Sequence, residues 1–186
     1  MRSSPIAVAN GFTAALPALP AAQLPKSRPA PVDDTLTRNI ATPTVAGKYV
    51  RTFSYSGPTG NIHVQSNAQD GTNPYADSEV TIASLPASLK GADFVQAAKA
   101  DRAYSAVDLM ELAVPAGAVI SIAHDNRLPV PTWLSKMFQP TGETVTVGGK
   151  AMSVFQHKAA SAESLTLGDN ATGDAKNANM YVVFVR

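Results

Sequence analysis

The chain has 186 residues with 45% apolar side chains, enough for one ordinary domain with a sizeable core and an appendage. Its formal net charge is +1 at pH 7, so no overall field favours nucleic acid or an anionic membrane surface. It has no cysteine, which excludes disulfides, thiolate metal sites and cysteine nucleophiles within this sequence. No run approaches the roughly 18 consecutive apolar residues expected of a membrane span.

Residues 1–44 are typical of an extended arm rich in proline and alanine. Seven of the 14 prolines lie within the first 43 residues. Proline lacks an N–H donor and blocks helix interiors, so this stretch favours an extended or polyproline-like chain. We expect the arm to bind a groove of a neighbouring subunit, and a plain linker is the alternative. The anchors would be Ile6, Val8, Phe12, Leu16, Leu19, Leu24 and Arg28.

The same segment has some features of a secretion signal, because Arg2 precedes the fairly apolar run IAVANGFTAALPALPAA. Asn10, Gly11, Pro17 and Pro20 interrupt this run, whereas the apolar core of a signal is smoother. We therefore favour an uncleaved N-terminus and keep a cleaved signal as the alternative.

From Gly47 onward, short alternating runs between turn signals indicate an all-β domain, which we place at residues 45–186. Residues 131–138 allow at most one helical turn. Eight or more short strands with Gly and Pro turns predict a β-sandwich or jelly roll. Whether residues 47–76 complete the sandwich or form a small subdomain stays open. Strands are expected within residues 49–55, 62–66, 79–83, 107–114, 118–125, 144–147, 151–158, 163–168 and 179–186, and residues 93–98 form another short strand or a turn.

Two hairpins are predicted from the turns. Pro115-Ala116-Gly117 makes a short connection between residues 107–114 and 118–125, so we expect these two strands to pair. Gly148-Gly149 would join the strands at 144–147 and 151–158 in the same way. The closing segment 179–186 is apolar on both faces, which predicts a strand that is buried on both sides.

Five stretches between residues 77 and 186 share order and spacing with a known module. They are DSEVTIASLPASLKGADFVQAAKADR, DLMELAVPAGAVISIAHDNRLPVPTWL, FQPTGETVTV, FQHKAASAESLTLGDN and NMYVVFV. Together they resemble the C-terminal β-sandwich accessory module of secreted bacterial polysaccharide lyases. The residues retained from the group's pattern are Asp125, Arg127, Pro131, Trp133 and Leu134. The resemblance implies a non-catalytic module for which carbohydrate is the expected ligand, and the lyase activity does not carry over.

The sequence departs from that group at two places. Ile122-Ala123-His124 stands where the group usually has valine-tyrosine-valine-alanine before the acid, and KADR (99–102) replaces an Asp-Asp-Lys-like turn.

HDNRLPVPTWL (124–134) concentrates polar side chains just before the only tryptophan of the chain. His124 and Asp125 are neighbours on a strand, so their side chains point to opposite faces and cannot form a catalytic relay with each other. We expect Asp125 to accept backbone N–H bonds, and Arg127 either to pair with Asp125 or to lie across Trp133. This loop-framework role is preferred. The alternative is a glycan platform formed by an exposed Trp133 with Asp125 and Arg127.

No cofactor is predicted. His63, His124 and His157 have no paired-ligand spacing, so each is expected at the surface. The loops at 67–77 and 167–177 hold Asp and Asn residues that could bind calcium, but neither matches an EF-hand, and ordinary turns are expected.

Two functions are compatible with these features. The preferred one is a non-catalytic structural protein of a large assembly, above all a bacteriophage virion protein for capsid decoration, cement or fibre attachment. Its arm would bind other copies of the chain or capsid and tail proteins through many weak contacts. The alternative is a secreted, extracellular carbohydrate-binding accessory module. Neither reading involves enzyme activity, nucleic acid or a membrane.

Overall fold

The computed structural model describes residues 47–60, 62–170 and 176–186, and it confirms the all-β prediction. The arm predicted for residues 1–44, with its anchors from Ile6 to Arg28, lies outside the described residues. Within the described ranges, no helix is long and apolar enough to cross a membrane.

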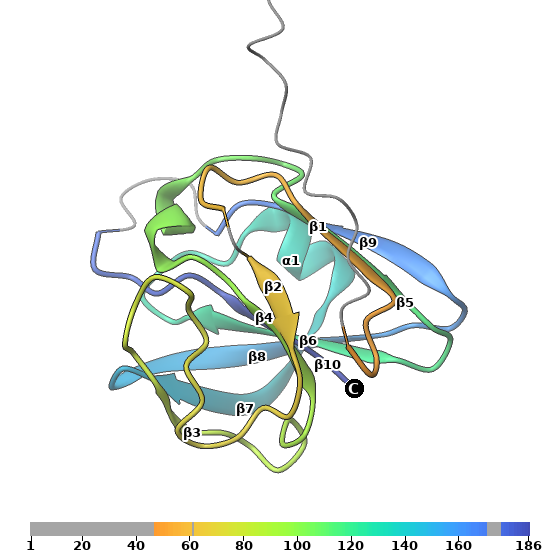
Figure 1. The fold of residues 1–186 in the computed structure, drawn as a ribbon, viewed down its shortest axis with the longest axis horizontal. Coiled ribbons are helices and arrows are strands. Elements are labelled where there is room, and N and C mark those ends of the chain that lie inside the picture. The colour runs from red at the N-terminus through yellow and green to blue at the C-terminus, as the bar shows by residue number, and fades with distance from the viewer. Residues whose placement is uncertain (1–46, 61, 171–175) are drawn as a thin grey trace, which may run out of the picture. The chain divides into compact units, whose positions relative to one another are not determined.

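The described chain is built from short strands with one 3-10 turn and one short helix (Figure 1). In chain order these elements are β1 (Thr52–Tyr55), β2 (His63–Gln65), β3 (Ile82–Ser84), β4 (Asp93–Gln96), η2 (Lys99–Ala103), β5 (Met110–Val114), β6 (Val119–Asp125), α1 (Thr132–Met137), β7 (Gln139–Val147), β8 (Lys150–Lys158), β9 (Glu163–Leu167) and β10 (Val182–Val185).

The strands form two antiparallel sheets. The small sheet has the order β1-β5-β9, and the large sheet has the order β2-β4-β10-β6-β8-β7-β3. β1 pairs with β5 in the small sheet, and β2 pairs with β4 in the large one. Residues 47–76 therefore contribute to both sheets, which answers the question that the sequence pattern left open.

The predicted hairpin between β5 and β6 is wrong. β5 pairs with β1 and β9 in the small sheet, whereas β6 pairs with β10 and β8 in the large sheet. Pro115-Ala116-Gly117 is thus a corner between the sheets, and the Gly117 N–H donates to the Ala159 carbonyl at 2.8 Å. The burial patterns explain the separation. β5 alternates between buried and more exposed residues, as in a sheet with one solvated face, whereas β6 is buried on both faces.

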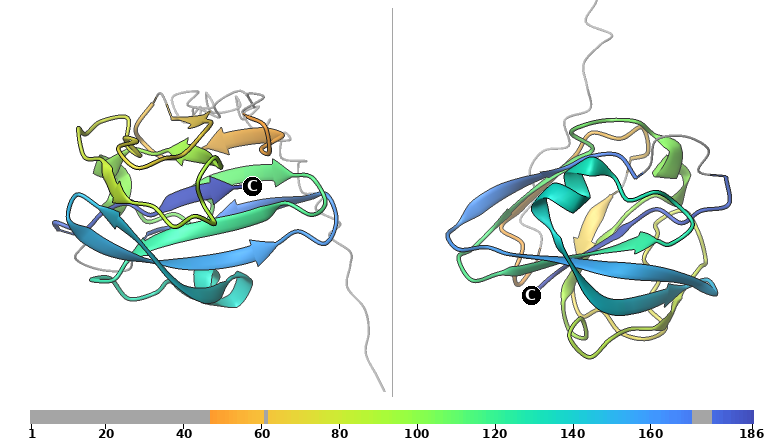
Figure 2. Two further views of the ribbon diagram at one scale, coloured as in Figure 1. Left: turned by 90° about the horizontal axis from the view of Figure 1, so that it is seen from below. Right: turned by 180° about the vertical axis from the view of Figure 1, so that it is seen from behind.

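The second predicted hairpin is confirmed. β7 and β8 pair up to Val147 and Lys150, and the two glycines between them have φ values of +54° and +72°. A two-residue turn with positive φ at both positions matches the right-handed twist of the flanking strands. This twist is clear in both views of Figure 2.

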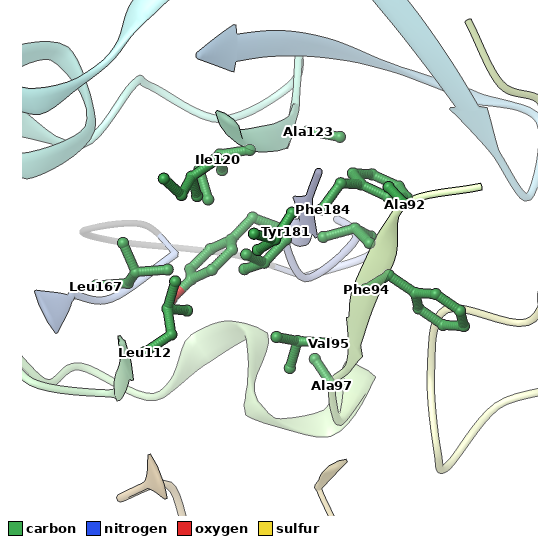
Figure 3. Packing of buried hydrophobic residues seen from close by; sticks show 14 of the residues in the cluster. Ala92, Phe94, Val95, Ala97, Leu112, Ile120, Ala123, Leu167, Tyr181 and Phe184 are labelled. Atoms are coloured by element: carbon green, nitrogen blue, oxygen red, sulfur yellow. The ribbon is translucent and has the colours of Figure 1, made fainter. Parts of the chain in front are cut away.

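β10 is an inner strand of the large sheet, between β4 and β6, and all four of its residues are buried, as predicted. Just before it, Tyr181 extends its ring towards Leu112 of β5 and Leu167 of β9 (Figure 3). These contacts place the main core between the two sheets, and each of the three side chains is fully buried.

Candidate functional site

The segment HDNRLPVPTWL spans the end of β6, a loop and the start of α1. The Asp125 carboxylate, which is fully buried, accepts three hydrogen bonds from Arg127: from the backbone N–H at 3.0 Å, Nε at 2.9 Å and Nη2 at 2.5 Å. Its Oδ2 also accepts the backbone N–H of Asn179 at 2.8 Å. Of the two arrangements expected for Arg127, the structure has the pairing with Asp125.

Burial alone would raise the pKa of Asp125. The Arg127 guanidinium and the N–H groups of Asn179 and Arg127 outweigh burial and hold that pKa below its usual value. The carboxylate is therefore charged at neutral pH and serves to fix the loop to the start of the β10 segment.

Three side chains bind three consecutive main-chain carbonyls in residues 168–170. Tyr181 Oη donates to the first carbonyl at 2.9 Å, Trp133 Nε1 to the second at 2.8 Å, and His124 Nε2 lies 3.0 Å from the third. We call Tyr181, Trp133 and His124 the carbonyl clamp. It fixes the backbone of residues 168–170, directly after β9.

His124 is 1% exposed, so its predicted surface position is wrong. A carbonyl oxygen only accepts, which means that Nε2 of His124 carries the proton. Burial lowers the pKa of His124 and keeps the ring neutral. The His124 ring binds the Asn170 carbonyl, whereas the Asp125 carboxylate binds Arg127 and Asn179. His124 and Asp125 therefore hold different segments of the chain.

Two buried asparagines complete this framework. Sequence reasoning placed Asn170 only among possible calcium ligands in the loop at 167–177, and it missed Asn179. The Asn170 side chain accepts the Tyr181 N–H at 3.0 Å and donates to the Asn179 carbonyl at 3.0 Å. The Asn179 side chain donates to the Val147 carbonyl at 3.1 Å. A signal existed, because Asn170 ends one of the stretches shared with the accessory module and Asn179 begins the next.

Trp133 also lines a pocket on the surface, which we call the tryptophan pocket. Its volume is about 280 Å³, and its lining residues are Val107, Pro129, Val130, Pro131, Thr132, Trp133 and Asp169. The Trp133 indole ring also packs against two aromatic rings. Its centre lies 6.2 Å from that of Phe138, in an edge-on arrangement, and 5.5 Å from that of Tyr181. An aromatic side chain beside hydroxyl and carboxylate groups is a chemistry suited to sugar binding.

A second pocket of about 350 Å³ lies near the end of β10. We call it the β10 pocket; Ala92 and Phe184, which lie close together in Figure 3, belong to its lining. The other lining residues are Ser88, Leu89, Val119, Ser121, Gln156, Val185 and Arg186.

The remaining candidates do not gather at either pocket. His63 is exposed on β2, and His157 of β8 bonds Glu163 and the Met137 carbonyl. In the loop at 67–77, Asp70 pairs with Lys90, and Asp77 accepts two backbone N–H groups of η2. Within the described ranges, no three His, Asp or Glu side chains come together as a metal site, and residues 171–175 of the second loop lie outside those ranges.

Comparisons with known proteins find two β-glucuronidases to which this chain is similar. No family model matches it. A β-glucuronidase of Formosa agariphila is 30% identical over 187 residues, which include 100% of this chain and 19% of that protein. A solved structure of a β-glucuronidase from glycoside hydrolase family 2 is 33% identical with a TM-score of 0.68, over 72% of this chain and 14% of that one.

A further structure, a GH138 enzyme targeting pectin rhamnogalacturonan II, has a TM-score of 0.46 and 11% identity over 78% of this chain and 16% of that one. This likeness is too low to carry an argument.

The chain spans about a fifth of the β-glucuronidase that it matches, so it is similar to one segment of a much longer enzyme. The solved relative supports the β-sandwich fold. Nothing in these comparisons supports the predicted virion function, and they favour the carbohydrate-related alternative. The part of the resemblance that specified polysaccharide lyases stays a prediction.

Proposed function

We propose that the chain is a non-catalytic carbohydrate-binding accessory module of a glycan-degrading system. The observation that carries this proposal is the alignment of the whole chain with only 19% of a β-glucuronidase. A segment of that extent corresponds to one domain of a longer enzyme, and the fold of this domain is a β-sandwich.

The geometry of HDNRLPVPTWL supports a non-catalytic role. A general acid or base must reach the proton of a substrate at a cleft. Here the Asp125 carboxylate and the His124 ring are buried, and their hydrogen bonds go to Arg127 and to main-chain groups. These two side chains hold the loop in place, and the proposed ligand contacts lie elsewhere.

The proposed ligand class and location follow from the relatives. A β-glucuronidase acts on glucuronic acid linkages, so a polysaccharide that contains glucuronate is the first ligand to test. Such polymers occur outside cells, and we therefore propose an extracellular location, which was the alternative to the virion.

The test is affinity gel electrophoresis of the full chain in gels that contain glucuronate-bearing polysaccharides. We expect retarded migration that free polysaccharide suppresses, whereas the heat-unfolded chain and a gel without polysaccharide serve as controls. Unchanged migration in every gel would refute the proposal. So would hydrolysis of p-nitrophenyl β-D-glucuronide by the chain, because that result would make it an enzyme.

A further inference from the structure

The tryptophan pocket offers a rigid aromatic platform. Trp133 is held by its Nε1 bond to the Asp169 carbonyl and by contacts with Phe138 and Tyr181. A side chain placed on Gly168 would overlap the indole ring, so the backbone there lies directly against it. A ring that is already fixed loses little freedom when a ligand stacks on it, which lowers the entropic cost of binding.

The pocket also has an exposed apolar rim. Val107 is 89% exposed and Val130 is 45% exposed, and in the described part of the chain only Tyr104, at 38%, joins them as an exposed large hydrophobic residue. Pro129 and Pro131 lie beside Val130 in the lining and stiffen the loop. A concave surface lined mainly by apolar side chains with a few polar groups is typical of ligand sites.

Two polar groups complete the pocket. The Thr132 hydroxyl can donate and accept, and the Asp169 carboxylate is an acceptor for hydroxyl groups. None of the hydrogen bonds seen within the described ranges uses the Asp169 side chain, whereas its main chain is fixed by the carbonyl clamp. The Asp169 residue thus lines the pocket on a backbone whose carbonyl is already held by Trp133.

We propose that the tryptophan pocket binds an uncharged sugar ring of the polysaccharide. Its C–H face would lie near Trp133 and the apolar rim, and two neighbouring hydroxyls would donate to Asp169. This inference rests on the proposed carbohydrate-binding function and names the site and the sugar class. A volume of about 280 Å³ suits one ring rather than a chain segment. The glucuronate residues of the polymer would lie outside the pocket, because their carboxylates would repel Asp169.

The test uses Trp133 as its own reporter, because it is the only tryptophan of the whole chain. Methyl glycosides of glucose, galactose, xylose and rhamnose are titrated into the full chain, with glucuronic acid as the charged comparison. We expect a saturable change in tryptophan emission with at least one neutral glycoside and a response to glucuronic acid that is at least fivefold weaker.

Variants separate the pocket from the rest of the surface. Asp169→Ala and Thr132→Ala are expected to weaken neutral-sugar binding about tenfold and about threefold, since each removes hydrogen bonds to the ligand. Asp169→Asn is expected to bring the glucuronic acid response closer to that of the neutral sugars. The control is Gln156→Ala in the β10 pocket, which should bind as the parent does. Unfolding curves confirm that each variant is folded.

The outcomes also distinguish this inference from the proposed function. Polysaccharide binding with unchanged tryptophan emission, or with full binding by Asp169→Ala, would place the glycan site elsewhere and overturn the inference alone. Loss of polysaccharide binding altogether would overturn both. If Val107→Ser changed the sedimentation of the chain and left its sugar binding intact, the apolar rim would be a protein-docking surface, which also overturns the inference.

Discussion

Asp125 shows how one residue can be buried and still charged. Its side chain is fully buried, yet four hydrogen bonds from Arg127 and Asn179 surround the carboxylate. Two of these donors belong to a guanidinium that is 38% exposed, so the positive charge keeps part of its hydration. The pair therefore avoids much of the desolvation cost that two fully buried charges would carry.

Replacing Arg127 with alanine is expected to lower the free energy of unfolding by about 1–3 kcal/mol, because Asp125 would keep its burial and lose its charged donors. The matched control is Lys90→Ala, which breaks a pair with Asp70 whose side chains are both 49% exposed. Exposed pairs contribute little. Urea unfolding of the two variants measures the contrast. Equal effects would mean that Arg127 acts only as a surface charge.

The lowered pKa of Asp125 has a consequence for stability against pH. Because the folded state holds this carboxyl below the usual pKa of about 3.9, the contribution to stability is complete above that value. It is lost as the pH falls through the folded-state pKa. We expect the difference in unfolding free energy between the parent and Asp125→Asn to be constant near neutral pH and to narrow as the pH falls below about 4. Parallel pH profiles in urea unfolding would contradict this assignment.

At the scale of elements, the β7–β8 hairpin depends on two glycines with different surroundings. Both have positive φ, but a Cβ on Gly148 would lie 2.7 Å from Val80 Cγ1, whereas a Cβ on Gly149 would meet open space. Gly149→Ala should therefore cost about 1–2 kcal/mol from backbone strain alone. Gly148→Ala should lower the free energy of unfolding further. Combining it with Val80→Ala should recover part of that additional loss. Thermal unfolding of the three variants tests the order, and equal costs for the two glycines would refute it.

The elements also show what a sequence can and cannot predict. The turn and pairing of the β7–β8 hairpin were predictable because both lie within one local stretch. The length of β7 was not, because it begins at Gln139 rather than at residue 144. The partners of β5 and β6 were not, because both strands are apolar and a short connection looks the same as a hairpin turn or a corner between sheets. What distinguishes β5 from β6 in the structure is that one face of β5 is partly exposed. That exposure depends on its partners β1 and β9, which lie far away in the sequence.

The same limit applies to the candidate site. The pairing of Asp125 with Arg127 was predictable because the two are separated by a single residue. The carbonyl clamp was not, because it joins His124 and Trp133 to residues 168–170 across a gap of more than 30 positions. For the same reason, Asp169 and Val107 could not be placed beside Trp133 until the fold was known.

At the scale of the whole molecule, Asp93 anchors the first described residues of the chain. This carboxylate on β4 accepts the backbone N–H of Tyr49 at 2.5 Å and of Val50 at 3.2 Å, and the Ser66 hydroxyl at 3.0 Å. Gly47 packs so closely against the same carboxyl group that it leaves no room for a side chain. The first described residues are thus fixed to the large sheet before β1 enters the small one.

Deletions on either side of this anchor should behave differently. Removing residues 1–44 keeps the donors to Asp93 that the described residues supply. We therefore expect an unchanged urea midpoint, and unchanged polysaccharide binding because the tryptophan pocket is lined by residues between 107 and 169. Removing residues 1–50 deletes the buried Val50 and two donors to Asp93, which is 1% exposed. That loss should lower the free energy of unfolding by roughly 2–5 kcal/mol.

If the shorter deletion were equally destabilising, the folding unit would have to include residues before Gly47. If it abolished binding while leaving the midpoint unchanged, residues 1–44 would belong to the ligand site.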